Sequence, residues 1–291
     1  MLRMPGSLFL VATPIGNLED ITLRAIRVLG EVGIIACEDT RRTRGLLTHL
    51  GISKPLVSYH EHNESRRTAE LIRKLEEGID IALVSDAGMP LVSDPGYELV
   101  REAIALNIAV VPVPGASALP AALAASGLHA DQFNFAGFLP ARQTARRSRL
   151  AELSSLKTTL VVFEAPHRIK AMIHDALDVL GDRQAAIARE LTKVHEEFIR
   201  GRLSELAGRI DDSEPRGEYV VVIGAANEQA VQQSSSSEST ASITDEVDRL
   251  VHTEGLDHKS ALKRVARQRG ISKAEAYRLA VLEKADSQAR K

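Results

Sequence analysis

Short apolar, β-branched runs recur along the N-terminal part of the chain and constrain its fold more than any other feature. They are Ser7–Ala12, Gly33–Cys37, Pro55–His60, Ile81–Asp86 and Ala109–Val113. Runs of this length and composition are typical of buried strands. Between them lie segments with helical spacing, such as Asn63–Glu77, whose apolar residues fall three or four apart among charges. Alternating strands and helices predict a mostly parallel sheet flanked by helices.

A second series of such runs follows the small-residue segment Ala116–Ser126. It comprises Phe133–Phe138, Thr158–Ala165, Ala185–Ala188, Glu196–Gly201 and Glu218–Gly224. We therefore expect two α/β domains, over residues 1–116 and 117–225. Residues 226–242 are poor in apolar side chains and rich in Ser and Gln, which predicts a flexible linker. Residues 243–291 predict a small helix-turn-helix-like module, with a helix on either side of Gly270.

The composition limits which partners and compartments are plausible. A net charge of -2 gives no overall attraction to phosphate, so a nucleic acid would need a local basic patch. Aromatic residues make up 3% of the chain, too few for a broad base-stacking platform. The single cysteine, Cys37, excludes an intrachain disulfide and predicts the cytoplasm. The apolar run before Thr13 is too short for a signal peptide or a membrane span, so we expect no membrane association.

The loops that follow the predicted strands are rich in turn-forming residues. Ligands of open parallel sheets bind at the carboxyl ends of the strands, where these loops begin. They are Thr13–Asn17, Ser85–Gly96, which holds two Gly, two Pro and two Asp, and Gly115–Ala118 at a helix start. Neither a G-x-G-x-x-G motif nor a P-loop is present, which disfavours dehydrogenases and NTPases. The alternative for the second loop is an ordinary irregular connection in which Asp94 caps the next helix.

These loops and further motifs resemble the tetrapyrrole (class III) methylases, and within them the ribosomal RNA small subunit methyltransferase I group. In order, the motifs are LFLVATPIGNLEDITLRA, EDTRRT, HEHNE, SDAGMPLVSDPGY, PGASA, SGL, GFLPAR, FEAPHR and ARELTKVHEE. Met89 stands where the family usually has Thr, and Ala116 where Pro is commoner. The resemblance implies an α/β, two-domain tetrapyrrole-methylase-like fold with the cofactor in the interdomain cleft, and a homodimer. The implied reaction is S-adenosylmethionine-dependent methylation of the ribose 2′-oxygen of a decoding-centre cytidine in 16S rRNA of the small ribosomal subunit.

The resemblance also implies which residues bind S-adenosylmethionine. The implied set is Pro14, Asp86, Ala87, Gly88, Leu91, Val92, Ser117, Ala118, Phe163, Glu164, Leu191, Gly217 and Glu218. Its small residues admit backbone contacts, and a carboxylate such as that of Asp86 can hold an ammonium group or ribose hydroxyls.

Methyl transfer to a ribose hydroxyl can rely on positioning alone, without a dedicated base. The alternative is that a nearby carboxylate or His takes the proton as the bond forms. The candidates for this proton acceptor are Glu38, Asp39, His60, Glu61, Glu64 and Glu164, none of them favoured by the sequence. For Glu38 and Asp39 the alternative is capping of the next helix. His60, His62 and Glu64 alternate along one strand face, but no second ligand cluster accompanies them, so we expect no metal.

Basic residues near these motifs predict a phosphate-binding patch, with scattered solvated charges as the alternative. They are Arg41, Arg42, Arg44, Arg142, Arg146, Arg147, Arg149, His167 and Arg168, together with Lys259, Lys263, Arg264, Arg267, Arg269 and Lys273 in the C-terminal module. Two other functions remain open. One is a sister enzyme that methylates a tetrapyrrole ring carbon, which needs an apolar, open cleft; the other is a non-catalytic nucleic-acid-binding protein. The Arg-rich motifs favour RNA.

Overall fold

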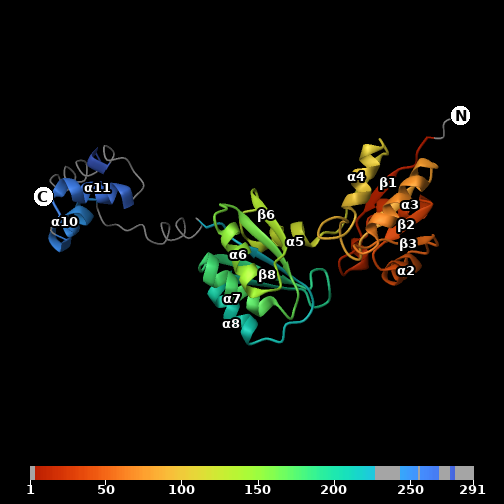
Figure 1. Ribbon diagram of the computed structural model, residues 1–291. Helices are drawn as coiled ribbons and strands as arrows, with labels where there is room; N and C mark the ends of the chain where they lie inside the picture. The colour runs from red at the N-terminus through yellow and green to blue at the C-terminus, as the bar shows by residue number, and fades with distance from the viewer. Residues whose placement is uncertain (1–3, 227–242, 255, 269–275, 279–291) are drawn as a thin grey trace. The chain divides into compact units, whose positions relative to one another are not determined.

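The computed structural model describes residues 4–226, 243–254, 256–268 and 276–278 (Figure 1). The chain forms two compact units, Met1–Glu228 and Gln229–Lys291. The predicted linker lies almost entirely outside the described residues, as does most of the helix predicted after Gly270. The boundary predicted at residue 116 falls inside the first unit and stays a prediction.

The first sheet consists of five strands that are all parallel to their neighbours, in the order β3-β2-β4-β1-β5. The strands are β1 (Leu8–Val11), β2 (Ile34–Cys37), β3 (Leu56–Ser58), β4 (Ile81–Val84) and β5 (Val110–Val113). Each lies within one of the predicted apolar runs. The predicted parallel sheet is therefore confirmed, and its strands all point their carboxyl ends toward the same edge.

Two apolar cores cover the two faces of this sheet. In β2, Ile34 and Ala36 belong to one core and Ile35 and Cys37 to the other, as expected from the two-residue period of a strand. The first core also holds residues of α3 (Glu64–Glu76) and α4 (Tyr97–Ala105). The second holds residues of α1 (Leu23–Glu31) and α2 (Thr40–His49). Burial on both faces explains why the strands read as continuous apolar runs.

The second sheet is mixed, with the order β6-β7-β10-β8-β9. Its strands are β6 (Phe133–Phe138), β7 (Thr159–Glu164), β8 (Gln184–Arg189), β9 (Glu197–Arg202) and β10 (Tyr219–Ile223). Only the β6–β7 pair in this sheet is parallel; β7–β10, β10–β8 and β8–β9 are antiparallel. A short loop rather than a helix joins β8 to β9, and such a loop permits only antiparallel pairing. The predicted strands are confirmed. The apolar runs did not indicate whether neighbouring strands are parallel or antiparallel.

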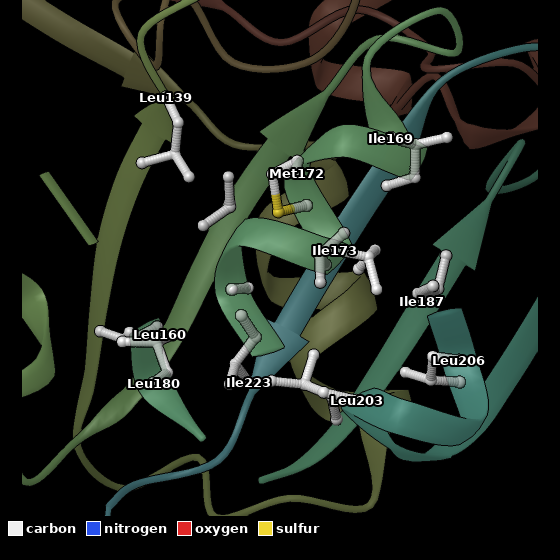
Figure 2. Packing of buried hydrophobic residues seen from close by; sticks show 14 of the residues in the cluster. Leu139, Leu160, Ile169, Met172, Ile173, Leu180, Ile187, Leu203, Leu206 and Ile223 are labelled. Atoms are coloured by element: carbon white, nitrogen blue, oxygen red, sulfur yellow. The ribbon is translucent and has the colours of Figure 1, made fainter. Parts of the chain in front are cut away.

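Helices cover both faces of the second sheet. One face packs against α6 (Gln143–Ser154), α7 (Ile169–Leu180) and α8 (Leu203–Asp211). Figure 2 shows this core, in which Met172 and Ile173 of α7 lie over Ile187 and Ile223 of the strands. The other face packs against α5 (Ala118–Ser126), which follows directly from the loop after β5. The start of α5 is thereby placed beside the carboxyl edge of the first sheet.

The C-terminal unit contains α10 (Ile243–Glu254) and α11 (His258–Gln268), and α11 lies where a helix was predicted before Gly270. Val247 and Leu250 of α10 pack with Ala261 and Val265 of α11. Lys259 is exposed at the start of α11. Among the described helices, none is both long enough and apolar enough to cross a membrane.

Candidate active site

A cavity of about 450 Å³ lies at the loops that the sequence singled out. Its lining comes from the loops after β1, β4 and β5 of the first sheet and from β7, β10 and the β8–β9 loop of the second. A volume of this size suits a small molecule or cofactor. Ten of the predicted cofactor-binding residues line it: Asp86, Ala87, Gly88, Val92, Ser117, Ala118, Phe163, Glu164, Leu191 and Glu218.

Three predicted cofactor-binding residues, Pro14, Leu91 and Gly217, are not among the lining residues. For Pro14 and Gly217 the neighbour in the chain lines the cavity instead, namely Ile15 and Glu218. Leu91 packs against the apolar core under α3 and α4. The cofactor-binding role of these three positions stays a prediction.

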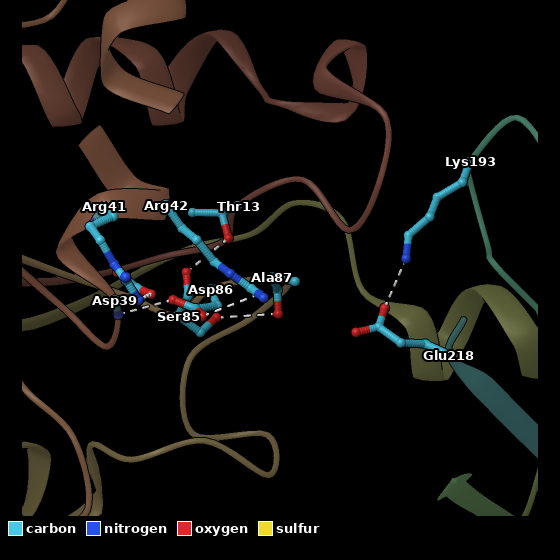
Figure 3. A network of polar contacts seen from close by, with 9 residues as sticks. All are labelled: Thr13, Asp39, Arg41, Arg42, Ser85, Asp86, Ala87, Lys193 and Glu218. Atoms are coloured by element: carbon cyan, nitrogen blue, oxygen red, sulfur yellow. Dashed lines mark hydrogen bonds and ion pairs between the residues drawn. The ribbon is translucent and has the colours of Figure 1, made fainter. Parts of the chain in front are cut away.

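Backbone hydrogen bonds connect the loop after β1 to the loop after β4. The N–H of Thr13 donates to the carbonyl oxygen of Gly88 (2.9 Å), and the N–H of Gly88 donates back to Thr13 (3.0 Å). The Thr13 hydroxyl also donates to the Ser85 carbonyl oxygen at 3.2 Å (Figure 3). Gly88 has a φ of 85°, a conformation that side chains disfavour. The resulting turn exposes backbone to the cavity, as the turn chemistry predicted.

Two cavity loops contain non-glycine residues with a left-handed backbone. In the loop after β4 these are Leu91 (φ 71°) and Ser93 (φ 69°). In the β8–β9 loop they are Glu190 (φ 51°) and Thr192 (φ 64°). Such conformations are uncommon outside glycine, and they concentrate at ligand-binding sites, where the surrounding structure holds them. Both loops therefore have the local strain of a functional segment.

The β8–β9 loop also reaches the loop after β1. The backbone N–H of Asn17 donates to the Thr192 hydroxyl (3.1 Å), and any Cβ at position 16 would overlap the Lys193 side chain. Lys193 in turn pairs with Glu190 (2.8 Å) and with Glu218 (3.1 Å), the second of which is drawn in Figure 3. Gly16 thus allows the close approach that closes this side of the cavity.

The cavity is rich in negative charge. Among the described residues that line it, four are carboxylates and one is a permanent cation; they are Asp86, Asp94, Glu164 and Glu218, and Arg42. One oxygen of Asp86 accepts the backbone N–H of Asp39 (3.1 Å), and the other lies 3.3 Å from the Arg42 guanidinium (Figure 3). A cavity with this balance favours a ligand that carries positive charge.

Glu164 ends β7 with a side chain that is fully buried. One of its oxygens accepts the N–H of Ala165 (2.9 Å) and lies 3.1 Å from Arg168, whereas the other has no hydrogen-bond partner among the described residues. Burial raises the pKa of Glu164, and the Ala165 N–H and Arg168 oppose that shift. An unsatisfied buried oxygen beside a cavity is the position in which a ligand donor is expected.

Asp94 lines the cavity, whereas the alternative interpretation of its loop made it the cap of the next helix. Burial first, and then the nearby charges of Glu38 and Asp86, raise the pKa of Asp94 to about 6, against a smaller opposing effect of the Ser85 hydroxyl. The capping interpretation is wrong, because Gly96 occupies the N-cap of α4. In the sequence, the only indication that Asp94 lines a ligand site was that it is the second Asp of a loop already predicted to bind a ligand.

Glu64 provides the cap of α4 from a distant part of the sequence. One of its oxygens accepts the backbone N–H groups of Gly96 (3.1 Å) and Glu98 (3.3 Å) and the hydroxyl of the fully buried Tyr59 (3.0 Å). Glu64 is not among the cavity-lining residues. The structure therefore gives this carboxylate a capping role, because a carboxylate at a helix N-terminus satisfies its free donors.

Replacing Glu64 by Ala should destabilise the protein by about 1–2 kcal/mol, because two helix donors and a buried hydroxyl lose their acceptor. Urea unfolding measures the change, and the neighbouring exposed residue Glu61 provides the control as Glu61→Ala. Methyl transfer by the folded Glu64→Ala protein should persist. A variant of unchanged stability that has lost methyl transfer would restore Glu64 as a candidate proton acceptor.

Among the other predicted proton acceptors, Glu164 lines the cavity, whereas Glu38, Asp39, His60 and Glu61 are not among its lining residues. Asp39 caps α2, accepting the backbone N–H of Arg41 (2.8 Å), and the Arg41 side chain lowers the pKa of Asp39 to about 2. Glu38 is exposed overall, but partial burial of its carboxyl group and the negative charge of Asp86 raise its pKa. His60 bonds to Asn63 through its backbone N–H (2.9 Å) and ring Nε2 (3.0 Å). No three described His, Cys, Asp or Glu side chains are grouped to hold a metal ion.

Part of the predicted phosphate patch is structural. Arg146 is only 4% exposed and pairs with Asp175 at 2.6 Å, so its assignment to phosphate binding is wrong. Arg147 pairs with the same carboxylate (3.0 Å), and Arg168 donates to the Leu139 carbonyl oxygen. The remaining predicted cations that the structure describes are exposed: Arg41, Arg42, Arg44, Arg142, Arg149, His167, Lys259, Lys263 and Arg264. Arg269, Lys273 and the side chain of Arg267 lie outside the described residues.

Residues 7–207 match the family of tetrapyrrole (corrin/porphyrin) methylases. The chain belongs to this family. Over 274 residues it is 47% identical to the ribosomal RNA small subunit methyltransferase I of Halalkalibacterium halodurans, an alignment that covers 94% of each protein. The protein of the same name from Synechocystis is 44% identical over 97% of this chain and 99% of the relative.

A solved structure, the uroporphyrin-III C-methyltransferase of Thermus thermophilus complexed with S-adenyl homocysteine, has the same fold. It superposes with a TM-score of 0.52 over 76% of this chain and 98% of that protein, at 23% sequence identity. The predicted tetrapyrrole-methylase fold and the predicted methyltransferase class are confirmed. The roles of individual cavity residues stay predictions.

Proposed function

We propose that the chain is an S-adenosylmethionine-dependent methyltransferase that methylates the ribose 2′-oxygen of a decoding-centre cytidine in 16S rRNA. The observation that carries this proposal is the 47% identity, over 94% of both chains, to a relative named ribosomal RNA small subunit methyltransferase I. The cofactor is supported by the Thermus thermophilus methyltransferase of the same fold, whose structure is a complex with S-adenyl homocysteine. S-adenosylmethionine supplies a methyl group on a positively charged sulfur.

The cavity suits that cofactor in charge, shape and hydrogen bonding. Its excess of carboxylates complements the sulfonium and ammonium charges, and the unpartnered oxygen of Glu164 offers an acceptor for a cofactor N–H or O–H group. Phe163 supplies an apolar wall. Its ring makes edge-to-face contacts with the rings of Phe135 and Phe138, at centroid distances of 4.8 and 5.8 Å. Small residues such as Ala118 leave room at the start of α5.

The first turn of α2 is the part of the surface that we assign to RNA phosphates. It carries Arg41 and Arg42, and Arg44 follows in the next turn; all three are exposed, and Arg42 also lines the cavity. Contacts to phosphates position an RNA without reading its sequence, so these arginines would bring an acceptor ribose to the cavity mouth. The predicted homodimer and the predicted RNA contact of the C-terminal module remain predictions.

The purified protein should transfer labelled methyl from S-adenosylmethionine to small ribosomal subunits that lack this modification. Methylation of a 2′-oxygen removes the nucleophile for alkaline cleavage of the next phosphodiester bond. We therefore expect the label in an alkali-resistant dinucleotide whose 5′ nucleoside is cytidine. Free 16S rRNA and large subunits are the controls for substrate context.

Two outcomes would contradict the proposed function. Label on a base carbon or nitrogen would exclude ribose methylation. Transfer to a tetrapyrrole but not to small subunits would assign the chain to the other branch of its family.

A further inference from the structure

The cavity carboxylates differ in how far their oxygens are already engaged. Asp86 is held by the Asp39 N–H and by Arg42. Glu218 pairs with Lys193, and its side chain is 75% exposed. Glu164 is fully buried beside Arg168, and its unpartnered oxygen is the one that we assign to the cofactor. Asp94 lines the cavity, is half-buried, and forms no ion pair with any described residue; its partner is the neutral hydroxyl of Ser85.

The backbone on both sides of Asp94 is held in place. Ser93 precedes it in the left-handed conformation, and Pro95 follows it and restricts Asp94 to extended backbone. Gly96 has a φ of 137°, and its N–H is bound to Glu64. These constraints fix where the backbone of Asp94 lies relative to the cavity. Strain of this kind is characteristic of residues that contact ligands.

The charges that face Asp94 make it an effective proton acceptor. Two carboxylates, Glu38 after β2 and Asp86 after β4, act on it, and Arg42 of α2 lines the same cavity. Burial and these like charges raise the pKa of Asp94 to about 6. A general base is most effective when its pKa lies just below the working pH, because it is then both ionised and basic.

We propose that Asp94 accepts the proton of the acceptor hydroxyl during methyl transfer. The O–H bond of the acceptor breaks and its proton passes to a carboxylate oxygen of Asp94. An oxygen–methyl bond forms as the sulfur–methyl bond breaks, and the electron pair of that bond stays on sulfur. The carboxylic acid then releases its proton to water. This assignment rests on the proposed function, since it requires a hydroxyl acceptor.

Asp94→Asn tests the assignment because the amide has nearly the same shape but cannot take the proton. The single-turnover methyl-transfer rate to small subunits should fall by at least about 100-fold. S-adenosylmethionine affinity, measured by calorimetry, should fall by no more than about fivefold, because three of the four cavity carboxylates remain. Glu98→Gln, a carboxylate-to-amide change on the surface of α4 that breaks the ion pair with Arg101, is the matched control and should keep the wild-type rate.

The pH profile separates proton transfer from a structural effect. The wild-type rate should rise with pH through about 6 and then level off, as Asp94 ionises. Asp94→Asn should lose that rise, and Asp94→Glu should regain part of the rate. A raised carboxyl pKa destabilises the folded state at neutral pH, so Asp94→Asn should melt at the same temperature as the wild type or higher.

Three outcomes would overturn the assignment: an undiminished rate in Asp94→Asn, a retained rise near pH 6 in that variant, or a loss of its cofactor binding. Failure of the proposed function looks different. In that case the wild-type protein itself would not place the label on a ribose oxygen.

Discussion

Asp175→Ala is expected to destabilise the protein by about 3–5 kcal/mol, because it breaks a buried ion pair by removing one partner. Asp175 is 1% exposed and joins α7 to α6 through Arg146, whose Nε and Nη2 lie 2.7 and 2.6 Å from one carboxylate oxygen. Gln143 (3.1 Å) and Arg147 (3.0 Å) bind the other oxygen. Removing the carboxylate leaves the Arg146 guanidinium buried and without its counter-charge.

Urea unfolding of Asp175→Ala and Asp178→Ala side by side measures this effect. The Asp178 side chain also pairs with Arg147 but is 57% exposed, so its loss should cost no more than about 1 kcal/mol. A double variant, Asp175→Leu with Arg146→Met, should recover most of the lost stability, because it replaces the pair by apolar groups. An Asp175→Ala protein within about 1 kcal/mol of the wild type would contradict this account of the α6–α7 contact.

The same pair predicts a pH dependence of stability. Burial by itself raises the pKa of Asp175, but the hydrogen bonds from Gln143, Arg146 and Arg147 outweigh it and lower the pKa below its ordinary value. The stabilisation is therefore complete above the ordinary aspartate range and disappears as pH falls through the lowered value. Asp175→Ala should accordingly lose less stability than the wild type on strong acidification.

The strands were predictable because a strand that is buried on both faces is apolar along its whole length in the sequence. Each residue of Ile34–Cys37 enters one of two cores, so the whole segment is apolar, and the same holds for Ile81–Val84. Strand direction leaves no such pattern in the sequence. The antiparallel pairing of β8 with β9 depends on a seven-residue connection, residues 190–196, whose length alone distinguishes it from a helical crossover.

The site was predictable where its chemistry is local and not where it depends on distant contacts. The turn residues of Ser85–Gly96 indicated a ligand loop, and Asp86 and Gly88 do line the cavity. Asp94, followed by Pro-Gly and a helix, has the pattern of a cap, but the acceptor that caps α4 comes from Glu64, 32 residues earlier than Gly96. Arg146 belongs to a basic run in the sequence. Its structural role depends on the ion pair with Asp175, which lies 29 residues later in the chain.

Ala87→Trp is expected to weaken S-adenosylmethionine binding by more than about 100-fold, or roughly 3 kcal/mol. Ala87 is exposed yet lines the cavity, so an indole at this position would occupy much of the 450 Å³ space without disturbing a core. The unfolding free energy should change by no more than about 0.5 kcal/mol, as is usual for surface substitutions. Ala87→Ser, which adds a single oxygen, is the control and should bind within a fewfold of the wild type.

Calorimetric titration of S-adenosylmethionine into the wild-type protein, with Ala87→Trp alongside, tests most directly whether this cavity is the cofactor site. We predict saturable binding at one site per chain in the wild type and no measurable binding in the variant at the same concentrations. Absence of saturable binding to the wild type, or equal affinity in the two proteins, would contradict the assignment of this cavity to the methyl donor.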